Sequence, residues 1–236
     1  MTPDFSKRSA AIEIMDDLNC SGDVVNQTLK ELDTINKFLG GNKVTLQGIE
    51  SLVKKKLATG LHIVDLGCGS GELLKIVARK FRKSNPHSIF LGIDANPNIV
   101  RYAQKHVLPF PEVSISTEDI LDTEFKQKKF DIILATLFFH HFSSTQLIQI
   151  FKGFKKQACL GVVINDLHRH WLAYYSIKIL TRFFSRSSMV KYDAPLSVHR
   201  GFKRAELMDI LHQAGIKNYT LKWKWAFRWQ VVISTA

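Results

Sequence analysis

Three glycines at alternate positions follow a short apolar run that contains one acid. The run spans residues 61–66 and includes Asp65, and Gly67, Gly69 and Gly71 come directly after it. Glycine is needed where the backbone turns tightly or passes close to a ligand, because a Cβ would collide there. A carboxylate at the end of a strand repels a pyrophosphate and suits a cation or an ammonium group. The segment therefore predicts a loop that binds a positively charged ligand; the alternative is a glycine-rich turn without a ligand.

A second acid, Asp94, closes the next apolar run, residues 88–93, one β-α-β step beyond Gly71. A carboxylate at the tip of this strand can accept hydrogen bonds from both hydroxyls of a ribose. Pro97 fits the first turn of the helix that follows, where its missing N–H costs nothing. Asp94 is therefore predicted to bind a ribose; the alternative is a helix cap, a common role of Asp and Asn.

Two further segments place polar side chains after strands. Residues 113–117 alternate like a strand and lead into Glu118 and Asp119. Residues 130–135 form an apolar run with one acid, which is typical of a central parallel strand, and His140 and His141 follow it. In a doubly wound sheet the ligand crevice lies at the carboxyl ends of the strands, so all four segments are predicted to meet at one site.

These segments resemble a known family. Residues 64–74 resemble motif I of the class I S-adenosylmethionine-dependent methyltransferases, and residues 92–97 resemble their motif II. A dinucleotide-binding loop would have its third glycine at position 72, which is Glu72 here. The resemblance implies S-adenosylmethionine as cofactor, with Asp65 at its methionine end. It implies Asp119, in preference to Glu118, at the adenine amino group, with Ile120 packed on the ring. The predicted cofactor-binding residues are Asp65, Gly67, Cys68, Gly69, Gly71, Asp94, Ala95, Asp119, Ile120 and Ala135.

The segment after residue 135 limits the classes of acceptor that the enzyme is expected to methylate. Methyltransferases of nucleic-acid amino groups carry an (N/D)-P-P-(Y/F) loop at this position, whereas residues 136–142 of this chain contain no proline and have two histidines among phenylalanines. The His-His pair resembles the ubiquinone/menaquinone-biosynthesis type and related small-molecule enzymes, in which the second histidine is often structural. The residues around 163–169 and 197–202 resemble a bacterial subgroup met beside polyketide and pigment pathways.

Methylation of a hydroxyl requires removal of a proton, and histidine is well tuned for this at neutral pH. Asp166 neighbours His168 and could orient it as a base. The alternative for each histidine is an ordinary packed or capping residue. No metal-binding triad is evident, so no metal is predicted. The predicted catalytic candidates are His140, His141, His168 and His199.

The order of elements predicts the fold. Helical patterns span residues 12–18, 23–39 and 49–57, and strands then alternate with helices. This alternation predicts an α/β fold with a doubly wound, mostly parallel seven-stranded sheet. Residues 222–233 alternate with strand period over twelve residues, which is long for one strand, so a hairpin reversal is expected near Ala226. The predicted strands are 61–66, 88–94, 113–117, 130–135 and 159–165, and the helices 71–82, 97–106, 144–157 and 204–213.

One domain, residues 1–236, is predicted with four parts. Residues 1–58 form an N-terminal helical lid, 59–166 the cofactor-binding core, 167–200 an acceptor-lid insertion, and 201–236 the last helix and the hairpin. Within the insertion, one helical stripe is apolar and another is basic. That pattern fits a substrate lid, a helix packed on the sheet, or contact with an anionic membrane surface. The stripes are Trp171, Tyr175, Ile179 and Phe183, and Lys178, Arg182 and Arg186.

Composition limits the partners. The formal net charge is +12, but the basic residues are dispersed, for example at 54–56, 126–129 and 152–156, so no nucleic-acid partner is expected. Three scattered cysteines form no disulfide or zinc pattern, and no secretory or membrane-spanning segment is evident, so a cytoplasmic location is expected. The oligomeric state is not predicted.

The function predicted is S-adenosylmethionine-dependent methylation of a small, aromatic, phenolic or polyketide-like acceptor, with O-methylation favoured. The alternatives are methylation of a quinone-like lipid, of RNA or of a protein, and a non-catalytic scaffold that keeps the cofactor pocket.

Overall fold

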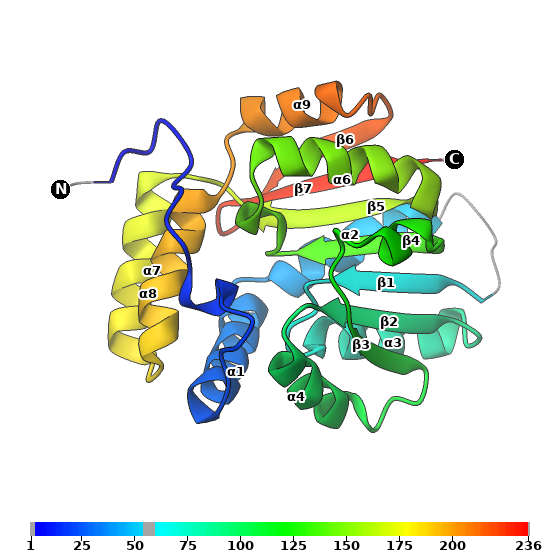
Figure 1. Cartoon of the computed structure of the whole chain (residues 1–236), viewed down its shortest axis with the longest axis horizontal. Coiled ribbons are helices and arrows are strands. Elements are labelled where there is room, and N and C mark those ends of the chain that lie inside the picture. The colour runs from blue at the N-terminus through cyan, green and yellow to red at the C-terminus, as the bar shows by residue number, and fades with distance from the viewer. Residues whose placement is uncertain (1–2, 54–59, 236) are drawn as a thin grey trace.

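Seven strands form one sheet in the order β3-β2-β1-β4-β5-β7-β6 (Figure 1). The computed structural model describes residues 3–53 and 60–235. Strands β1 to β5 are parallel, and β7 is antiparallel to both of its neighbours, β5 and β6. The predicted mostly parallel sheet is confirmed. The strands are β1 (His62–Leu66), β2 (Ile89–Asp94), β3 (Val113–Thr117), β4 (Phe130–Thr136), β5 (Ala158–Leu167), β6 (Tyr219–Lys224) and β7 (Arg228–Ser234).

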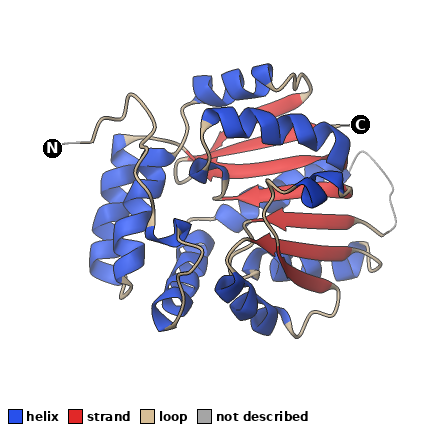
Figure 2. Ribbon diagram, in the orientation of Figure 1, coloured by secondary structure: helices blue, strands red, loops and turns tan. Residues whose placement is uncertain are grey.

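Helices cover both faces of this sheet (Figure 2). Because both faces are buried, the central strands carry continuous apolar runs instead of alternating ones. One face is covered by α2 (Gly41–Val53), α3 (Glu72–Ser84) and α4 (Pro97–Val107). The other is covered by α5 (Thr123–Gln127), α6 (Ser144–Gln157) and α9 (Arg204–Gln213).

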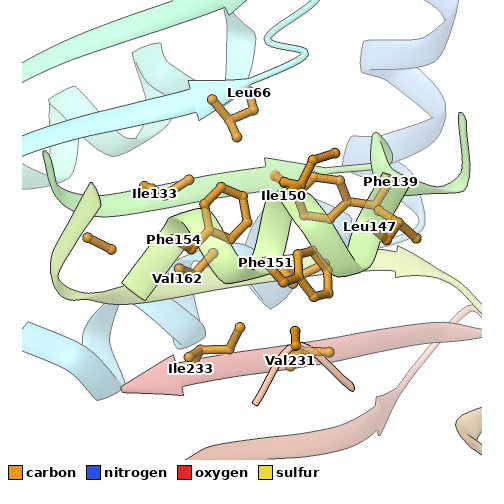
Figure 3. Packing of buried hydrophobic residues seen from close by; sticks show 14 of the residues in the cluster. Leu66, Ile133, Phe139, Leu147, Ile150, Phe151, Phe154, Val162, Val231 and Ile233 are labelled. Atoms are coloured by element: carbon orange, nitrogen blue, oxygen red, sulfur yellow. The ribbon is translucent and has the colours of Figure 1, made fainter. Parts of the chain in front are cut away.

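The core beneath α6 fixes the central strands. Phe151 and Phe154 of α6 are each 1% exposed and lie over Ile133 and Val162 of β4 and β5 (Figure 3). Phe139, just beyond β4, joins the same cluster and packs edge-on against Phe151 at 5.1 Å between ring centroids. The loop after β4 is therefore anchored in the core, which fixes the position of the two histidines that follow.

A separate group of helices lies beyond the carboxyl ends of the strands (Figure 1). It consists of the 3₁₀ turn η1 (Ile14–Asp16), α1 (Asp23–Phe38), α7 (Trp171–Phe184) and α8 (Ser188–Arg200). Thr28 of α1 and Ser187 at the start of α8 share a buried hydrogen bond of 2.7 Å. Asp193 of α8 accepts the backbone N–H groups of Ile14 and Met15. The N-terminal segment and the insertion are therefore one unit in space, although about 150 residues separate them.

The structure corrects several expected boundaries. The helix expected at 12–18 is only the short turn η1, because its backbone donors are satisfied by Asp193. The helix expected at 49–57 begins at Gly41, after Gly40 reverses the chain with a φ of 72°. Residues 54–57, with the lysines at 54–56, lie outside the described residues. The insertion forms two helices, since Ser187 caps a second one. The hairpin reverses at Ala226 and Phe227 as predicted, both with positive φ.

Candidate active site

A cavity of about 850 Å³ opens where the carboxyl ends of β1, β2, β4 and β5 face η1, α1, α7 and α8. This is the edge of the sheet at which ligands bind in doubly wound folds. Most of the predicted cofactor-binding residues line it: Asp65, Gly67, Cys68, Gly69, Asp94, Ala95, Asp119 and Ile120. Gly71 and Ala135 do not line it.

The three glycines of the loop have different roles. A Cβ on Gly67 would lie 2.2 Å from the ring of Phe138, so this glycine lets the loop after β4 cross over it. A Cβ on Gly71 would lie 2.9 Å from Val107, so this glycine allows α3 to pack closely on α4. Gly69 has a φ of 53°, and a Cβ there would meet only Leu29, at 3.7 Å. Gly69 is therefore the glycine whose missing side chain leaves room in the cavity itself.

Two buried carboxylates face this space. Asp94 accepts the backbone N–H of Gly69 at 3.2 Å and that of Asn96 at 3.0 Å, so it is tied to the glycine loop and is not merely a helix cap. Asp65 is 3% exposed, and the described residues give its carboxylate no hydrogen bond. Burial and, secondarily, the charge of Asp94 raise the pKa of Asp65 to about 7. An unpartnered carboxylate of this kind is stabilised by a positively charged ligand.

The two acids after β3 have different roles: Glu118 pairs with a lysine, and Asp119 keeps an oxygen for a ligand. Glu118 forms an ion pair with Lys128 at 2.6 Å. Asp119 accepts the backbone N–H of Leu121 at 2.8 Å through one oxygen only, which leaves the other for a ligand. Ile120 is 5% exposed and packs in the core while also reaching the cavity. This arrangement favours Asp119 over Glu118 as the ligand-binding acid.

His140 forms a buried dyad with Asp166. Its Nδ1 donates to Asp166 Oδ1 at 2.7 Å, and it is 3% exposed. Asp166 also accepts the backbone N–H groups of Phe139, His140 and Leu167. Burial alone would raise the pKa of Asp166, but the charge and hydrogen bond of His140 hold that pKa below its usual value. Asp166 therefore orients His140, and not His168 as expected, because β5 turns its side chain toward the loop after β4.

His141 forms a second dyad that is open to the cavity. Its Nδ1 donates to Asp16 Oδ1 at 2.6 Å, and its side chain is 25% exposed. Burial opposes ionisation of Asp16, yet hydrogen bonds from His141 and Arg200 hold its pKa well below the usual value. In the part of the chain that the structure describes, the Nε2 atom of His141 has no hydrogen bond.

Glu13 lies between the two histidines. Its Oε1 is buried without a hydrogen bond and is 3.7 Å from His140 Nε2. Burial raises the pKa of Glu13 to about 7. Glu13, His140 and His141 each offer one metal-ligand atom, all within 4.8 Å of one another. Arg200 Nη1, however, lies 3.4 Å from Glu13 Oε1 and already supplies a positive charge, which disfavours a metal ion at this cluster.

The other two candidate histidines lie outside the cavity lining. His168 accepts a hydrogen bond from Trp223 Nε1 at 3.2 Å and packs against Trp229. His199 contacts the backbone oxygen of Asp4 at 2.8 Å and packs against Phe5. The structure thus gives both of them packing roles, which was the alternative interpretation of each histidine.

Helix α1 closes the cofactor side. Ser70 of the glycine loop donates to Asp33 Oδ1 at 2.7 Å. Burial raises the pKa of Asp33 to about 6. Leu29 of α1 lies beside Gly69, so α1 contacts the glycine loop through both a hydrogen bond and an apolar side chain.

Sequence reasoning missed Glu13, Asp16, Asp33 and Arg228, all of which line the cavity. The first three lie in segments whose only visible signal was a helical stripe. Arg228 belongs to the alternating segment 222–233, which did not single it out as a cavity residue, and it is 2% exposed. Both faces of β7 are covered, one by α2 and the other by α6 and α9.

Comparisons with known proteins agree with this geometry. Residues 63–157 match the family described as "Methyltransferase domain". A carboxy-S-adenosyl-L-methionine synthase from Idiomarina loihiensis is 28% identical over 141 residues, which span 58% of this chain and 58% of that relative.

Solved structures share the fold. The plantazolicin methyltransferase BpumL in complex with SAH has a TM-score of 0.64 at 17% identity, with 89% of this chain and 88% of that chain covered. Magnesium protoporphyrin IX methyltransferase from Synechocystis PCC 6803, with bound SAM, has a TM-score of 0.58 at 16% identity, with 95% and 97% covered. The ubiquinone/menaquinone-type subgroup stays a prediction. The sheet order, the glycine loop with two acids and the match of residues 63–157 to the methyltransferase-domain family agree with the expected class I S-adenosylmethionine-dependent methyltransferase.

Proposed function

We propose that this protein transfers the methyl group of S-adenosylmethionine to a small acceptor with an aromatic or other apolar body, with oxygen as the favoured atom. One observation carries the proposal: a single cavity contains the glycine loop, the carboxylates of Asp65 and Asp94, and the free Nε2 of His141. The first three features fit the cofactor, and the last fits removal of a proton from the acceptor.

The cofactor end is suited to its ligand in charge and shape. When bound, S-adenosylmethionine supplies an electrophilic methyl group on a sulfonium. Asp94, held by the N–H of Gly69, is positioned to accept the ribose hydroxyls. Asp65 offers a negative charge to the ammonium group of the methionine moiety, and the open space above Gly69 accommodates that moiety. Asp119 is positioned to accept the adenine amino group.

His141 is the favoured base. Because Asp16 accepts its Nδ1–H, the lone pair of the imidazole lies on Nε2, where a base needs it. The negative charge of Asp16 also stabilises the imidazolium that forms when His141 takes a proton. His140 has the same arrangement with Asp166 and also lines the cavity, but it is 3% exposed and its Nε2 lies 3.7 Å from the Oε1 of Glu13, whereas the side chain of His141 is 25% exposed. We therefore assign His140 to positioning the loop and His141 to the chemistry.

Helices α1, α7 and α8 form the cover of the site. Leu172, Ile177 and Leu180 of α7 line the cavity, as do Leu29 and Leu32 of α1. An apolar cover excludes water, which would otherwise compete for the place of the acceptor. This supports the division of the chain into a core and two lid segments.

The nature of the acceptor follows from the rest of the lining. Phe138, Phe142 and Phe227 line the acceptor side, which favours a flat or apolar molecule. Two of the similar structures are named for plantazolicin and magnesium protoporphyrin IX, which supports a discrete compound over RNA or protein. The dispersed basic residues support the same choice.

One surface favours contact with a membrane. The outer face of α7 exposes Trp171, Ile179 and Phe183 at 56%, 58% and 73%, so this stripe is not packed on the sheet. Residues 167–192 contain no acid and several bases, including Lys178 and Arg182. Apolar and basic groups on one helix suit an anionic lipid surface. We propose a peripheral contact; among the described residues, no helix has the length and hydropathy to span a bilayer. A cytoplasmic location stays a prediction.

The test is a transfer assay with S-adenosylmethionine labelled in its methyl group. The purified protein is incubated with panels of phenols, quinols and carboxylic acids, and labelled products are identified by mass spectrometry. We expect label on the oxygen of a phenol or quinol. Tight binding of the cofactor without transfer to any panel, to RNA or to protein would favour the scaffold alternative and contradict the enzymatic proposal.

A further inference from the structure

Arg228, the first residue of β7, is a buried cation without a partner. It is 2% exposed, it lines the cavity, and its Nε and Nη1 atoms have no hydrogen bond. Burial lowers its pKa to about 10, so it remains charged at neutral pH. A buried charge that lacks partners is costly to the fold, and such groups are ordinarily paired.

The other buried arginines show what pairing looks like in this protein. Arg169, 1% exposed, forms a two-pronged ion pair with Glu206 and donates to three backbone oxygens. Arg200 pairs with Asp16 and donates to the backbone oxygens of His140 and His141. Arg228 is the exception among these three, and it is also the one that lines the cavity.

Asp166 acts on Arg228 through its charge, without forming an ion pair with it within 4.0 Å among the described residues. Both oxygens of Asp166 are already engaged by His140 and by three backbone N–H groups. Asp166 therefore leaves the Nε and Nη1 atoms of Arg228 without an acceptor among the described residues.

The chain makes room for this guanidinium. A Cβ on Gly41 would lie 2.8 Å from Arg228 Cζ and 1.8 Å from Asn36 Oδ1, so only glycine fits beside them. Asn36 and Asn42 line the same part of the cavity and are joined by a hydrogen bond of 2.6 Å. Trp223, Trp225 and Phe227 of the β6–β7 hairpin line it as well. The pocket around Arg228 is thus a cation and two amides beside an aromatic wall.

We propose that Arg228 binds a carboxylate of the acceptor, so that the acceptor is an aromatic or long apolar carboxylic acid. A guanidinium recognises a carboxylate through two parallel hydrogen bonds, and the aromatic wall fits the apolar body. In the sheet order, Arg228 on β7 lies away from β1, whose Asp65 marks the cofactor end, and therefore on the side that we assign to the acceptor. Three strand spacings, roughly 14 Å, separate β7 from β1, which carries Asp65. This inference rests on the proposed function, because it assigns the substrate class of the same site.

The experiment measures binding to the protein saturated with S-adenosylhomocysteine. Two pairs of probes are titrated: 3-phenylpropanoate against 3-phenylpropanamide, and 4-hydroxybenzoate against 4-hydroxybenzamide. We expect the wild type to bind each carboxylate about tenfold or more tightly than its amide. Arg228→Met should abolish this preference, and Arg228→Lys should keep part of it. Arg204→Met, which removes an exposed cation of α9, should leave it unchanged.

Two results would overturn the proposal. One is a wild type that does not prefer carboxylates, a measurement that depends on no variant. The other is a preference that Arg228→Met leaves intact. If Arg228→Met does not fold, the wild-type comparison and Arg228→Lys decide the question.

A further arm separates the acceptor from the cofactor as the source of the carboxylate. S-adenosylhomocysteine carries a carboxylate, whereas 5′-methylthioadenosine lacks the amino-acid moiety. Loss of the difference between these two ligands in Arg228→Met, with acceptor probes unaffected, would assign Arg228 to the cofactor and contradict the proposal. If the wild type binds neither adenosine compound, the proposed function fails, and the probe pairs still test Arg228 in the free protein.

Discussion

The two ends of the cavity are built in different ways. The cofactor end is formed by residues 65–120, in which each functional side chain follows a strand of the sheet. The acceptor end combines η1, the insertion helices and the start of β7, and α1 covers both ends of the cavity. The first end follows from local sequence, whereas the second exists only after distant segments come together.

The two ends also differ in charge. At the cofactor end, Asp65 and Asp94 are buried acids whose pKa values are raised chiefly by burial. At the acceptor end, Asp16 and Asp166 are satisfied by histidines, and Arg228 is the cation left without a partner. A cofactor with a positive charge and an acceptor with a negative one would complete both ends. The sign of the unpaired buried charge, more than the shape of the cavity, therefore distinguishes the two binding sites.

The largest effect on turnover is expected at His141, which pairs with Asp16. His141→Gln should lower turnover of a hydroxyl acceptor by about 10²–10⁴-fold, because the base is lost. Affinity for S-adenosylhomocysteine should change little. Steady-state rates measure this, and near-wild-type rates in His141→Gln would remove His141 from the chemistry.

Asp65 should make cofactor affinity depend on pH. Its pKa of about 7 means that a positively charged ligand must displace a proton below that pH. Affinity for S-adenosylhomocysteine should therefore weaken by about tenfold for each pH unit below 7. Asp65→Asn should bind more weakly at pH 8 and lose the dependence. Glu118→Gln, a change at an acid that is already paired with Lys128, should keep it.

In the protein without ligand, folding stability should depend on pH in the opposite direction to cofactor affinity. Because folding raises the pKa of Asp65, its native state holds a proton that the unfolded chain releases above a pH of about 4. Its contribution to stability is therefore lost as the pH rises from about 4 to 7. Denaturant unfolding of Asp65→Asn should show a smaller decline over that window; an identical pH profile would contradict the raised pKa.

The smallest effect is expected on the outer face of α7. Arg182→Gln should weaken binding to vesicles that contain phosphatidylserine by about fivefold, since each basic residue near such a surface contributes about 1 kcal/mol. Added salt should reduce the difference. Lys83→Gln, on α3 and away from the cavity, serves as the control. Sedimentation with vesicles measures this, and equal binding of wild type to neutral and anionic vesicles would argue against the membrane contact.

The sequence predicted the parts of the site that are local in the chain and did not predict the parts that distant segments form. Asp94, Gly67 and Gly69 line the cavity as expected because a strand, a tight turn and a helix are adjacent in sequence, so their spacing determines the geometry. The hairpin at Ala226 was found for the same reason. The pairing of His141 with Asp16 spans 125 residues, and no local pattern encodes it. Arg228 was not identified because alternation over residues 222–233 indicates a strand but does not show that both faces of β7 are covered.

The most direct test of the account is calorimetric titration of S-adenosylhomocysteine into wild type and Asp94→Ala at pH 8. We predict one site per chain in the wild type. Asp94→Ala should bind more weakly by roughly 2–4 kcal/mol, because the charge-assisted hydrogen bonds to the ribose are lost. Unchanged affinity in Asp94→Ala, or no binding by the folded wild type, would contradict the assignment of this cavity to the cofactor.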